Sequence, residues 1–585
     1  MPEPVDAALA RLGVRRLLLA IHDTSFPSDL DEDVGRGSPA TRAAGRLLRY
    51  ARSLGFTGIQ LGPQGQTSRD NASPYDGTIF SRHLGTIALH SLREGGPFAG
   101  LVGERVLARA LLDPGGGPAR HRHAYDAMHA LVDEAYFALR RRPDLAERLA
   151  GFRREHASWL DRDGLHAALC IERGTSSRHW AGLDARLWNP RPDEHAAAAA
   201  RRAELATTHA RAIERYAFGQ LLAHDEHRRV RATCADLQLA LYGDLQVGYA
   251  DADAWANAAS LLVGYVMGAP PSRTNPDGQP WNYPVLDPEK LGGAARAFVL
   301  ARLDKAFAEY DSMRIDHPHG LVCPWVYRAD TADPATAVRE GARLFESPDL
   351  PDHPALARFA IARPDQLDRT LPRHHDHWVI ELTPAQIDRY AVLFDAMAGS
   401  ARRHGRAFSD LSCEVLSTMP RPLACVIARH HLGRWRVTQK ANLDDPTDVY
   451  RTENAEPDDW VMIGNHDTAP IFSLIRGWSA AVRDKWARHL TQRLSLRRPE
   501  RLAQPGFLAT AMVAELFASR AENVSIFFAD LFGYEDRFNA PGTYNDLNWT
   551  LRLPHDFDEL HRTRLAANAA IDLALACELA LAARP

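Results

Sequence analysis

Short apolar runs alternate with amphipathic stretches along much of the chain. RRLLLAI (15–21) is an apolar run that predicts a buried strand. Ser38 and Pro39 predict the start of a helix, because they combine an N-cap with a proline at the first helical position, and Gly55 marks its end. TGIQLGP (57–63) predicts a second strand. A strand, a helix and a strand in this order form a βαβ unit and therefore a parallel sheet.

The sheet pattern lapses between the second and third predicted strands. Residues 90–235 carry helical periodicity, including alanines and leucines every three or four positions from 206 to 221, so we predict a helical insertion there. A second insertion is expected at 320–405 and contains a helix at 385–404. We expect the whole chain, 1–585, to form one catalytic unit.

Six further strands are predicted downstream. They are LQLALYGDLQV (237–247), DSMRID (311–316), RAFSDLSCEVL (406–416), GRWRVTQKA (433–441), DDWVMIGN (458–465) and ENVSIFF (522–528). With the first two they make eight strands joined by helical connections. This pattern favours a closed (β/α)8 TIM barrel with helical insertions between barrel strands, in which the chemistry lies at the C-terminal ends of the strands.

Acidic side chains fall at several of these strand ends. Asp244, Asp316, Glu414 and Asp467 lie late in a predicted strand or just after it. Side chains two apart on a strand point the same way, so Arg314 is expected beside Asp316 and favours its ionised form. Any one of these acids alone would be interpreted as a surface residue. Together they predict a single site.

Composition excludes several classes of function. The 585 residues are 45% hydrophobic and 25% charged, as in an ordinary globular protein. The net charge of −4 gives no electrostatic footprint for nucleic acid or an anionic membrane. No apolar run approaches the roughly 18 residues of a membrane helix, and the acidic N-terminus does not resemble a signal peptide. The six scattered cysteines argue against disulfides and a zinc cage, so a cytoplasmic location is expected.

A group of acids with nearby aromatic residues suggests glycoside chemistry. One carboxyl protonates the departing oxygen and another faces the oxocarbenium-like carbon, with ~5–5.5 Å between them in retaining enzymes. Tyr75 and Trp281 lie in loop-like positions flanked by proline and glycine, where they either bind sugar rings or simply anchor the loops. The HHDH run (374–377) could bind a metal but is more typical of a solvated loop, and we predict neither metal nor cofactor.

Several segments, in a fixed order from about residue 15 to 553, resemble the 4-α-glucanotransferases (amylomaltases, or disproportionating enzymes), relatives of the α-amylases. The segments that carry the resemblance are LGPQGQTSRDNASPYDG, YGDLQVGYADADAWAN, GAPPSRTNPDGQPWNYP, RIDH, GNHDT and DRFNAPGTYNDLNWTLRL. The resemblance implies a retaining transfer of α-1,4-glucan segments to maltooligosaccharides or other glucans. It also implies three catalytic acids, namely Asp316 as nucleophile, Glu414 as acid/base and Asp467 as transition-state stabiliser.

The same resemblance implies the substrate-binding residues. Tyr75 matches the family's stacking tyrosine, and Asp244 matches a sugar-binding aspartate. Gln279 and Trp281 lie in the segment that resembles the loop folding over the glucan. Arg314 and His466 flank the nucleophile and the stabiliser; they are expected to partner Asp316 and to bind a sugar hydroxyl, respectively.

The chain departs from the family pattern at some positions. Two registers fit the acid/base motif: one sets Ser409–Ser412 on it and loses the glutamate, and the other uses Glu414, which the downstream match favours. Asp410 is then interpreted as a buried, hydrogen-bonded strand residue. Pro318, His319 and Val415 also differ from the usual residues, which leaves donor length and acceptor preference open. A hydrolase of the same architecture and an inactive glucan-binding protein stay as alternatives, and the oligomeric state is not predicted.

Overall fold

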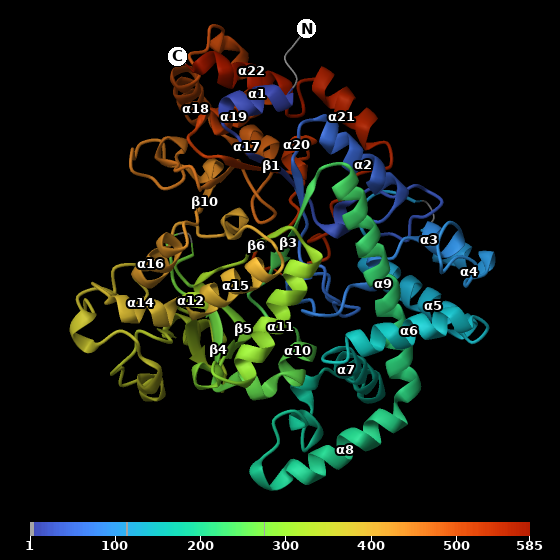
Figure 1. Ribbon diagram of the computed structural model, residues 1–585. Coiled ribbons are helices and arrows are strands. Elements are labelled where there is room, and N and C mark those ends of the chain that lie inside the picture. Colours follow the sequence, from blue (N-terminus) through green and yellow to red (C-terminus); the bar gives the residue numbers. More distant parts are fainter. Residues whose placement is uncertain (1–4, 113–114, 274, 544, 585) are drawn as a thin grey trace.

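Eight parallel strands form the centre of the molecule (Figure 1). The computed structural model describes residues 5–112, 115–273, 275–543 and 545–584. The barrel strands are β1 (Arg16–Ala20), β2 (Gly58–Gln60), β3 (Ala240–Leu245), β6 (Ser312–Ile315), β9 (Ser412–Cys413), β10 (Trp435–Val437), β11 (Trp460–Met462) and β12 (Asn523–Phe527). Their order in the sheet is β10-β11-β12-β1-β2-β3-β6-β9, with each neighbouring pair parallel.

The two ends of this sheet meet, so the barrel is nearly closed. No strand ladder joins β9 to β10 among the described residues. Instead, the Trp435 amide donates to the Val415 carbonyl at 3.2 Å, and the Trp435 indole N–H donates to Ser412 Oγ at 2.6 Å. The predicted eight-stranded barrel is therefore confirmed, and Val415 is a buried residue at its closing seam.

Helices surround the barrel and fill the connections between its strands. Those described are α1 (Val5–Leu12), α2 (Arg42–Ser53), α3 (Leu89–Arg93), α4 (Glu104–Ala110), α5 (His121–Leu139), α6 (Pro143–Glu155), α7 (Leu160–Arg173), α8 (His195–Thr208), α9 (Ala210–Asp236), α10 (Asp251–Ala256), α11 (Ala294–Glu309), α12 (His319–Val322), α13 (Pro334–Arg339), α14 (Pro384–Tyr390), α15 (Val392–Arg403), α16 (Arg421–Arg429), α17 (Ile471–Gly477), α18 (Ala480–Arg493), α19 (Pro505–Ala518), α20 (Phe528–Leu531), α21 (Phe557–Ala566) and α22 (Leu573–Ala583). The described helices between β2 and β3 are α3 to α9, and α8 projects from the rest of the molecule (Figure 1).

Some helix boundaries differ from the sequence predictions. The first barrel helix begins after Thr41, whose hydroxyl accepts from the Ala44 amide. The Ser38 hydroxyl donates to the Thr86 carbonyl and accepts from the Ala40 amide, ahead of the helix. The periodicity across 206–221 spans two helices that meet at His209. The helix predicted at 385–404 is likewise split, into α14 and α15, which meet at Ala391.

A second sheet, which the sequence analysis missed, lies beside the barrel. It has the order β5-β4-β7-β8, with β4 (Leu261–Ala269), β5 (Gln279–Leu286), β7 (Trp325–Arg328) and β8 (Ala342–Arg343), and its pairs are antiparallel. Gln279 and Trp281 are therefore on a strand, and their prediction as loop residues was wrong. The β4–β5 hairpin follows β3 in the chain, and β7 and β8 follow β6.

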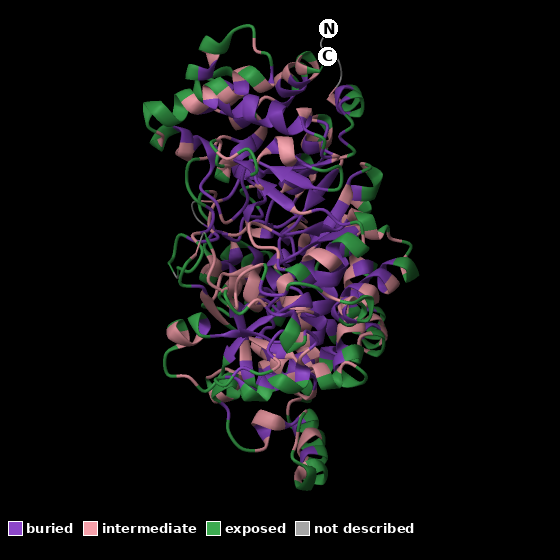
Figure 2. Cartoon of the chain, turned by 90° about the vertical axis from the view of Figure 1, so that its left-hand side faces the viewer, coloured by how far each residue is buried: buried purple, intermediate pink, exposed green. Residues whose placement is uncertain are grey.

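The core follows from alternation along the barrel strands. On β1, Leu17 and Leu19 pack outward against the surrounding helices. Leu18 instead belongs to an inner cluster with aromatic residues of β3, β10 and β11, among them Trp435 and Trp460. Figure 2 shows buried residues concentrated in the barrel and the helices around it. The inner cluster fills the barrel, so the polar side chains at the strand ends lie on a packed floor.

Candidate active site

Arg314 on β6 is at the centre of the polar residues at the strand ends. Parallel pairing sets Arg314 level with Asp244 on β3. Its Nη1 donates to Asp244 at 2.7 and 2.8 Å and to the Tyr75 hydroxyl at 3.1 Å. Its Nη2 donates to Asp316 Oδ1 at 3.0 Å and also to Glu414 Oε2. The buried guanidinium thus joins three carboxylates from three neighbouring strands.

The two carboxyl groups predicted to do the chemistry lie close together. An oxygen of Asp316 and an oxygen of Glu414 are within 4.8 Å of each other. Backbone pairing sets this separation, since the Glu414 amide donates to the Ile315 carbonyl at 3.1 Å. The second carboxylate oxygen of Asp316 accepts from the Val247 amide at 3.1 Å. Both side chains are almost fully buried, so their charges are weakly screened by solvent.

The surroundings give these two acids opposite protonation tendencies. Burial alone would raise the pKa of Asp316, but the positive charges of Arg314 and His317 lower it well below its usual range. Burial raises the pKa of Glu414 to about 7 despite Arg314 and His317, and the negative charge of Asp316 adds to the rise. One carboxyl is therefore ionised while the other holds a proton near neutral pH.

His317 is a second cation at the site, and the sequence analysis did not single it out. Its Nδ1 lies 3.0 Å from Asp316 Oδ1 and 3.5 Å from Glu414 Oε2. Burial opposes its charge, but the Asp316 carboxylate raises the pKa of His317 to about 9. Its backbone φ of +41° is uncommon for a residue other than glycine and belongs to the sharp turn after β6.

Tyr75, Asp244 and His466 form one wall of the site. The Tyr75 hydroxyl donates to Asp244 Oδ2 at 3.0 Å, and its ring stacks on the His466 ring with centroids 5.2 Å apart. Tyr75 belongs to a short 3₁₀ helix, Pro74–Asp76, in the segment after β2. Burial lowers the pKa of His466 well below its usual value, so this ring is neutral and can accept or donate a hydrogen bond.

Asp467 is the third acid, and it lies after β11. Its Oδ1 accepts from the Asn539 side-chain amide at 2.7 Å, and its Oδ2 lies 3.5 Å from His466 Nε2. Burial raises its pKa, with Arg314 among the charges that oppose the rise. About a third of the Asp467 side chain is exposed, unlike the other two acids, so it is the most accessible carboxylate of the three.

The second sheet brings Gln279 and Trp281 to the same place. The Trp281 indole N–H donates to Gln279 Oε1 at 3.0 Å, and the Trp281 ring meets the His317 ring edge-on with centroids 4.9 Å apart. Through His317 this hairpin reaches Asp316. All nine residues predicted for the site are thus brought into one connected group at one end of the barrel.

Asp410, the rival for the acid position, lies elsewhere. It is in a 3₁₀ helix (Phe408–Asp410) before β9, is partly exposed, and pairs with Arg16 at the N-terminal end of β1. Its interpretation as a buried strand residue was wrong, because only two residues of that predicted strand pair with a neighbour. His319 contacts the Thr418 carbonyl at 2.9 Å and joins the segments after β6 and β9.

Lys440 is a site residue that the sequence analysis missed. It ends the 3₁₀ helix Thr438–Lys440 directly after β10, whose neighbours on either side are followed by Glu414 and Asp467. Burial lowers its pKa, and the negative charges of Glu414 and Asp467 oppose that change. Its ammonium has no hydrogen bond to another described residue. Lys440 lies near the end of the predicted strand 433–441, so charged residues of either sign at the strand ends, and not only acids, are the signal that identifies it.

Two groups of described residues have the spacing of a metal site. Asp316, His317 and Glu414 form one, and Glu453, His489 and Glu515 form the other. In the first, the Arg314 guanidinium already bonds both carboxylates. In the second, arginines likewise contact the two glutamates. Both arrangements fit ion-pair networks better than a cation, and the run at 374–377 is not among them.

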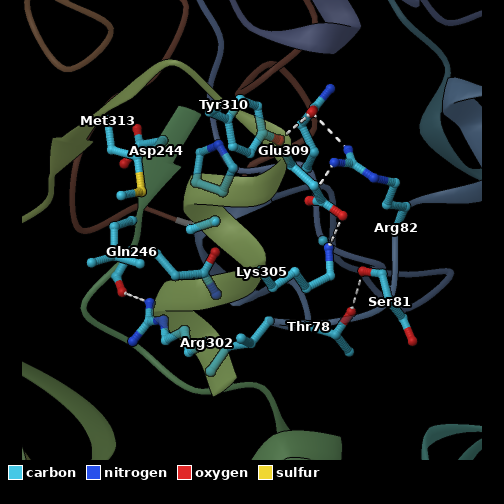
Figure 3. Close-up of a pocket in the computed structure, with 16 residues that line it drawn as sticks. Thr78, Ser81, Arg82, Asp244, Gln246, Arg302, Lys305, Glu309, Tyr310 and Met313 are labelled. Carbon is cyan, nitrogen blue, oxygen red and sulfur yellow. Dashed lines mark hydrogen bonds and ion pairs between the residues drawn. The ribbon is translucent and has the colours of Figure 1, made fainter. Parts of the chain in front are cut away.

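A small cavity of about 60 Å³ lies behind the site and is lined by β3, α11 and the segment after β2 (Figure 3). Arg82 and Lys305 reach Glu309 from two sides, each at 2.5 Å. Asp244 on β3 and Gln246 directly after this strand line the same cavity. The volume corresponds to a few water molecules rather than a sugar ring, and its charged side chains are ion-paired or hydrogen-bonded to other protein groups. We interpret it as structural support for the strand that carries Asp244.

Comparison with known proteins identifies the family of the chain. The sequence model of glycoside hydrolase family 77, described as 4-alpha-glucanotransferase, matches residues 21–557. The chain is 26% identical over 326 residues to the chloroplastic/amyloplastic 4-alpha-glucanotransferase of Solanum tuberosum, covering 53% of each chain. It is 28% identical over 321 residues to the 4-alpha-glucanotransferase of Thermus thermophilus, covering 52% of this chain and 59% of the relative. These matches thus span little more than half of each relative's length.

A solved structure has the same fold. The amylomaltase from Streptococcus agalactiae in complex with acarbose superposes with a TM-score of 0.72 at 16% identity, covering 95% of this chain and 100% of that one. None of the described helices has the length and apolar character needed to cross a membrane. The family match extends over most of the chain, including every strand of the barrel from β2 onward. The chain therefore belongs to the 4-alpha-glucanotransferase family, glycoside hydrolase family 77.

Proposed function

We propose that this protein is a retaining 4-α-glucanotransferase that acts on maltooligosaccharides and α-1,4-glucans. The observation that carries the proposal is the pair Asp316 and Glu414, whose oxygens lie within 4.8 Å and whose pKa values shift in opposite directions. This separation suits a covalent double displacement. Inverting enzymes keep their carboxyls ~6.5–9.5 Å apart to leave room for a water molecule.

In the first step, Asp316 attacks the anomeric carbon of the donor glucan. A bond forms between a carboxylate oxygen and that carbon while the bond to the departing 4-oxygen breaks, and Glu414 gives its proton to the departing oxygen. The hydrogen bonds from Arg314 and the Val247 amide hold the nucleophile ionised and oriented. The donor fragment that carried the 4-oxygen then leaves with a free 4-hydroxyl.

In the second step, the 4-hydroxyl of an acceptor sugar gives its proton to Glu414 and attacks the same carbon. The ester to Asp316 breaks, so configuration is retained and both acids return to their starting states. Asp467 is proposed to bind ring hydroxyls more tightly in the flattened transition state, which raises kcat. Its anchoring by Asn539 at 2.7 Å fixes one oxygen and leaves the other for the sugar.

The remaining predicted residues are proposed to hold the substrate. Tyr75 and Trp281 present aromatic rings, and Asp244, His466 and Gln279 offer hydrogen-bonding groups around Arg314. No cofactor takes part in these steps. We further propose that the protein acts in the cytoplasm and that residues 1–585 form one catalytic unit with insertions at 90–235 and 320–405.

Incubation with maltotriose tests the proposal. A ladder of longer chains together with glucose is the expected result, because departure of glucose leaves a maltosyl unit on Asp316, and this unit passes to the 4-hydroxyl of another maltotriose. Progressive shortening alone would identify a hydrolase, in which water outcompetes the acceptor. Binding of maltotriose without any product would identify a glucan-binding protein and overturn the proposed activity.

A further inference from the structure

A cleft of about 680 Å³ lies in the helical segment between β2 and β3, away from the barrel. It is lined by parts of α5, α6, α7, α8 and α9, and none of its lining residues belongs to the candidate active site. Five arginines line it, namely Arg140, Arg153, Arg162, Arg202 and Arg211. This concentration of positive charge stands out in a chain whose net charge is −4.

The acids in the cleft do not neutralise these arginines. Asp161 pairs with Arg153 at 3.1 Å, and Glu214 accepts from the Tyr136 hydroxyl at 2.5 Å. The other four arginines form no ion pair with a carboxylate among the described residues. Most of the positive charge in the cleft is therefore left without a counterion.

Two of these guanidinium groups are held against the same indole. Arg162 lies 4.4 Å and Arg202 lies 5.2 Å from the centroid of the Trp188 ring. Partial burial lowers the pKa of Arg162, Asp163 opposes this change, and repulsion from the neighbouring charge of Arg202 adds to it. Each is fixed by a hydrogen bond to a backbone carbonyl. An anion placed between them would relieve that repulsion.

The rest of the cleft is apolar. Leu165, Ile213 and the small side chains of Ala203 and Ala206 form walls beside Trp188. A volume of about 680 Å³ is in the range of sites for small organic molecules and is far larger than a bare phosphate ion requires. The site therefore combines an anion-binding end with an apolar wall of ligand size.

We propose that this cleft binds a small organic phosphate, a phosphate ester that carries an uncharged ring. The planar fork of a guanidinium matches phosphate oxygens, so Arg162 and Arg202 would hold the phosphate. Arg211 and Arg140 would contribute from α9 and the end of α5. The ring would lie along the alanine-lined wall. This inference does not depend on the proposed transferase activity.

The test is isothermal titration of the full chain with glucose 6-phosphate, with inorganic phosphate and glucose as comparisons. Glucose 6-phosphate is expected to bind one molecule per chain and at least about ten-fold more tightly than either comparison. The variant Arg202→Gln/Arg211→Gln is expected to weaken binding at least about ten-fold, because it removes two charge-assisted contacts. Arg154→Gln, which removes an exposed arginine outside the cleft, is expected to bind as the original chain does.

A second variant guards against a folding defect at Arg202. Arg140→Gln/Arg211→Gln changes two exposed residues whose side chains form no hydrogen bond to other described residues. This variant should therefore fold and still bind glucose 6-phosphate more weakly. Absence of binding to the original chain, or binding by both double variants as tight as that of the original chain, would overturn the proposal. If inorganic phosphate binds as tightly as glucose 6-phosphate, the proposed contact between the sugar ring and the apolar wall is wrong. If glucose binds as tightly as glucose 6-phosphate, the proposed contact between the phosphate and the arginines is wrong.

Discussion

At the scale of single residues, charge balance explains the site. Asp244, Asp316 and Glu414 share the Arg314 guanidinium, and His317 adds a second positive charge beside two of them. With Glu414 protonated and Asp244 ionised, two negative charges face two positive ones, so the buried group is neutral. Ionising Glu414 would add an uncompensated charge, which is the physical reason that burial raises the pKa of Glu414 to about 7.

Replacing the nucleophile should abolish transfer. Asp316→Asn keeps the shape of the side chain but cannot form the ester, so disproportionation of maltotriose is expected to fall by about 10³-fold or more. Product ladders resolved by chromatography measure it. Asp410→Asn is the matched control. This variant should keep most of the transferase activity, because Asp410 pairs with Arg16 at the other end of the barrel. The reverse ranking would refute the assignment of the acids.

The pH profile should report Glu414. Glycosylation needs its proton, so kcat/KM is expected to be highest on the acidic side and to fall through a midpoint near pH 7 as Glu414 ionises. His317 is positively charged and lowers the pKa of Glu414. His317→Gln removes that charge, so Glu414 keeps its proton to higher pH and the alkaline fall should move upward by about one pH unit.

His319→Gln is the control for this shift. Burial lowers the pKa of His319 to about 3, so it is neutral across the profile and its replacement changes no charge. Its alkaline fall should coincide with that of the unmodified protein. A fall that stays in place in His317→Gln would mean that another group, such as Asp244, controls the alkaline side; burial raises the pKa of Asp244 to about 7 as well.

At the scale of elements, the β4–β5 hairpin places the Trp281 ring in the site. Trp281 lies edge-on to His317 and hydrogen-bonds to Gln279. Trp281→Ala is expected to lower kcat/KM for maltotriose about ten-fold, through a higher KM, since it loses a contact of about 1.4 kcal/mol with the sugar. Val263→Ala, on the same hairpin and 81% exposed, should change neither parameter. Equal effects of the two variants would show that the hairpin acts only through its fold.

The sequence predicts some elements better than others for physical reasons. The eight barrel strands are short apolar runs whose ends carry polar residues, so the pattern locates both the strands and Asp316, Glu414 and Asp467. The strand β5 is not predicted from its pattern, because it contains Pro280 and Pro284, which argue against a strand in a sheet interior. It is the edge strand of its sheet, where a missing N–H is tolerated.

The site residues that were missed share a similar explanation. His317 and Lys440 are cations, whereas the glycoside chemistry predicted from the sequence depends on carboxylates and aromatic residues. The role of Asn539 depends on a contact between segments 72 positions apart, which no local pattern carries. Sequence thus predicts which residues stand at strand ends, whereas the partners that set their pKa values come from tertiary packing.

At the scale of the whole molecule, contacts between the first and last segments of the chain stabilise the barrel. β1 pairs with β12 along five residues of each strand, and α1 packs against α22 (Figure 1). Beyond the sheet, Arg552 reaches back to Asp33 with two hydrogen bonds of 2.6 and 2.8 Å. Both side chains are buried, so this ion pair links the first connection of the barrel to the segment after its last strand.

Breaking this ion pair should destabilise the fold without touching the chemistry. Asp33→Asn leaves the Arg552 charge buried without a counterion, at a cost of about 3–5 kcal/mol in the free energy of unfolding. Asp31→Asn is the control, since Asp31 is 56% exposed and its pair with Arg42 should contribute less than about 1 kcal/mol. Urea unfolding followed by tryptophan fluorescence measures both. Similar midpoints for the two variants would mean that the pairing of β1 with β12 holds the chain ends together unaided.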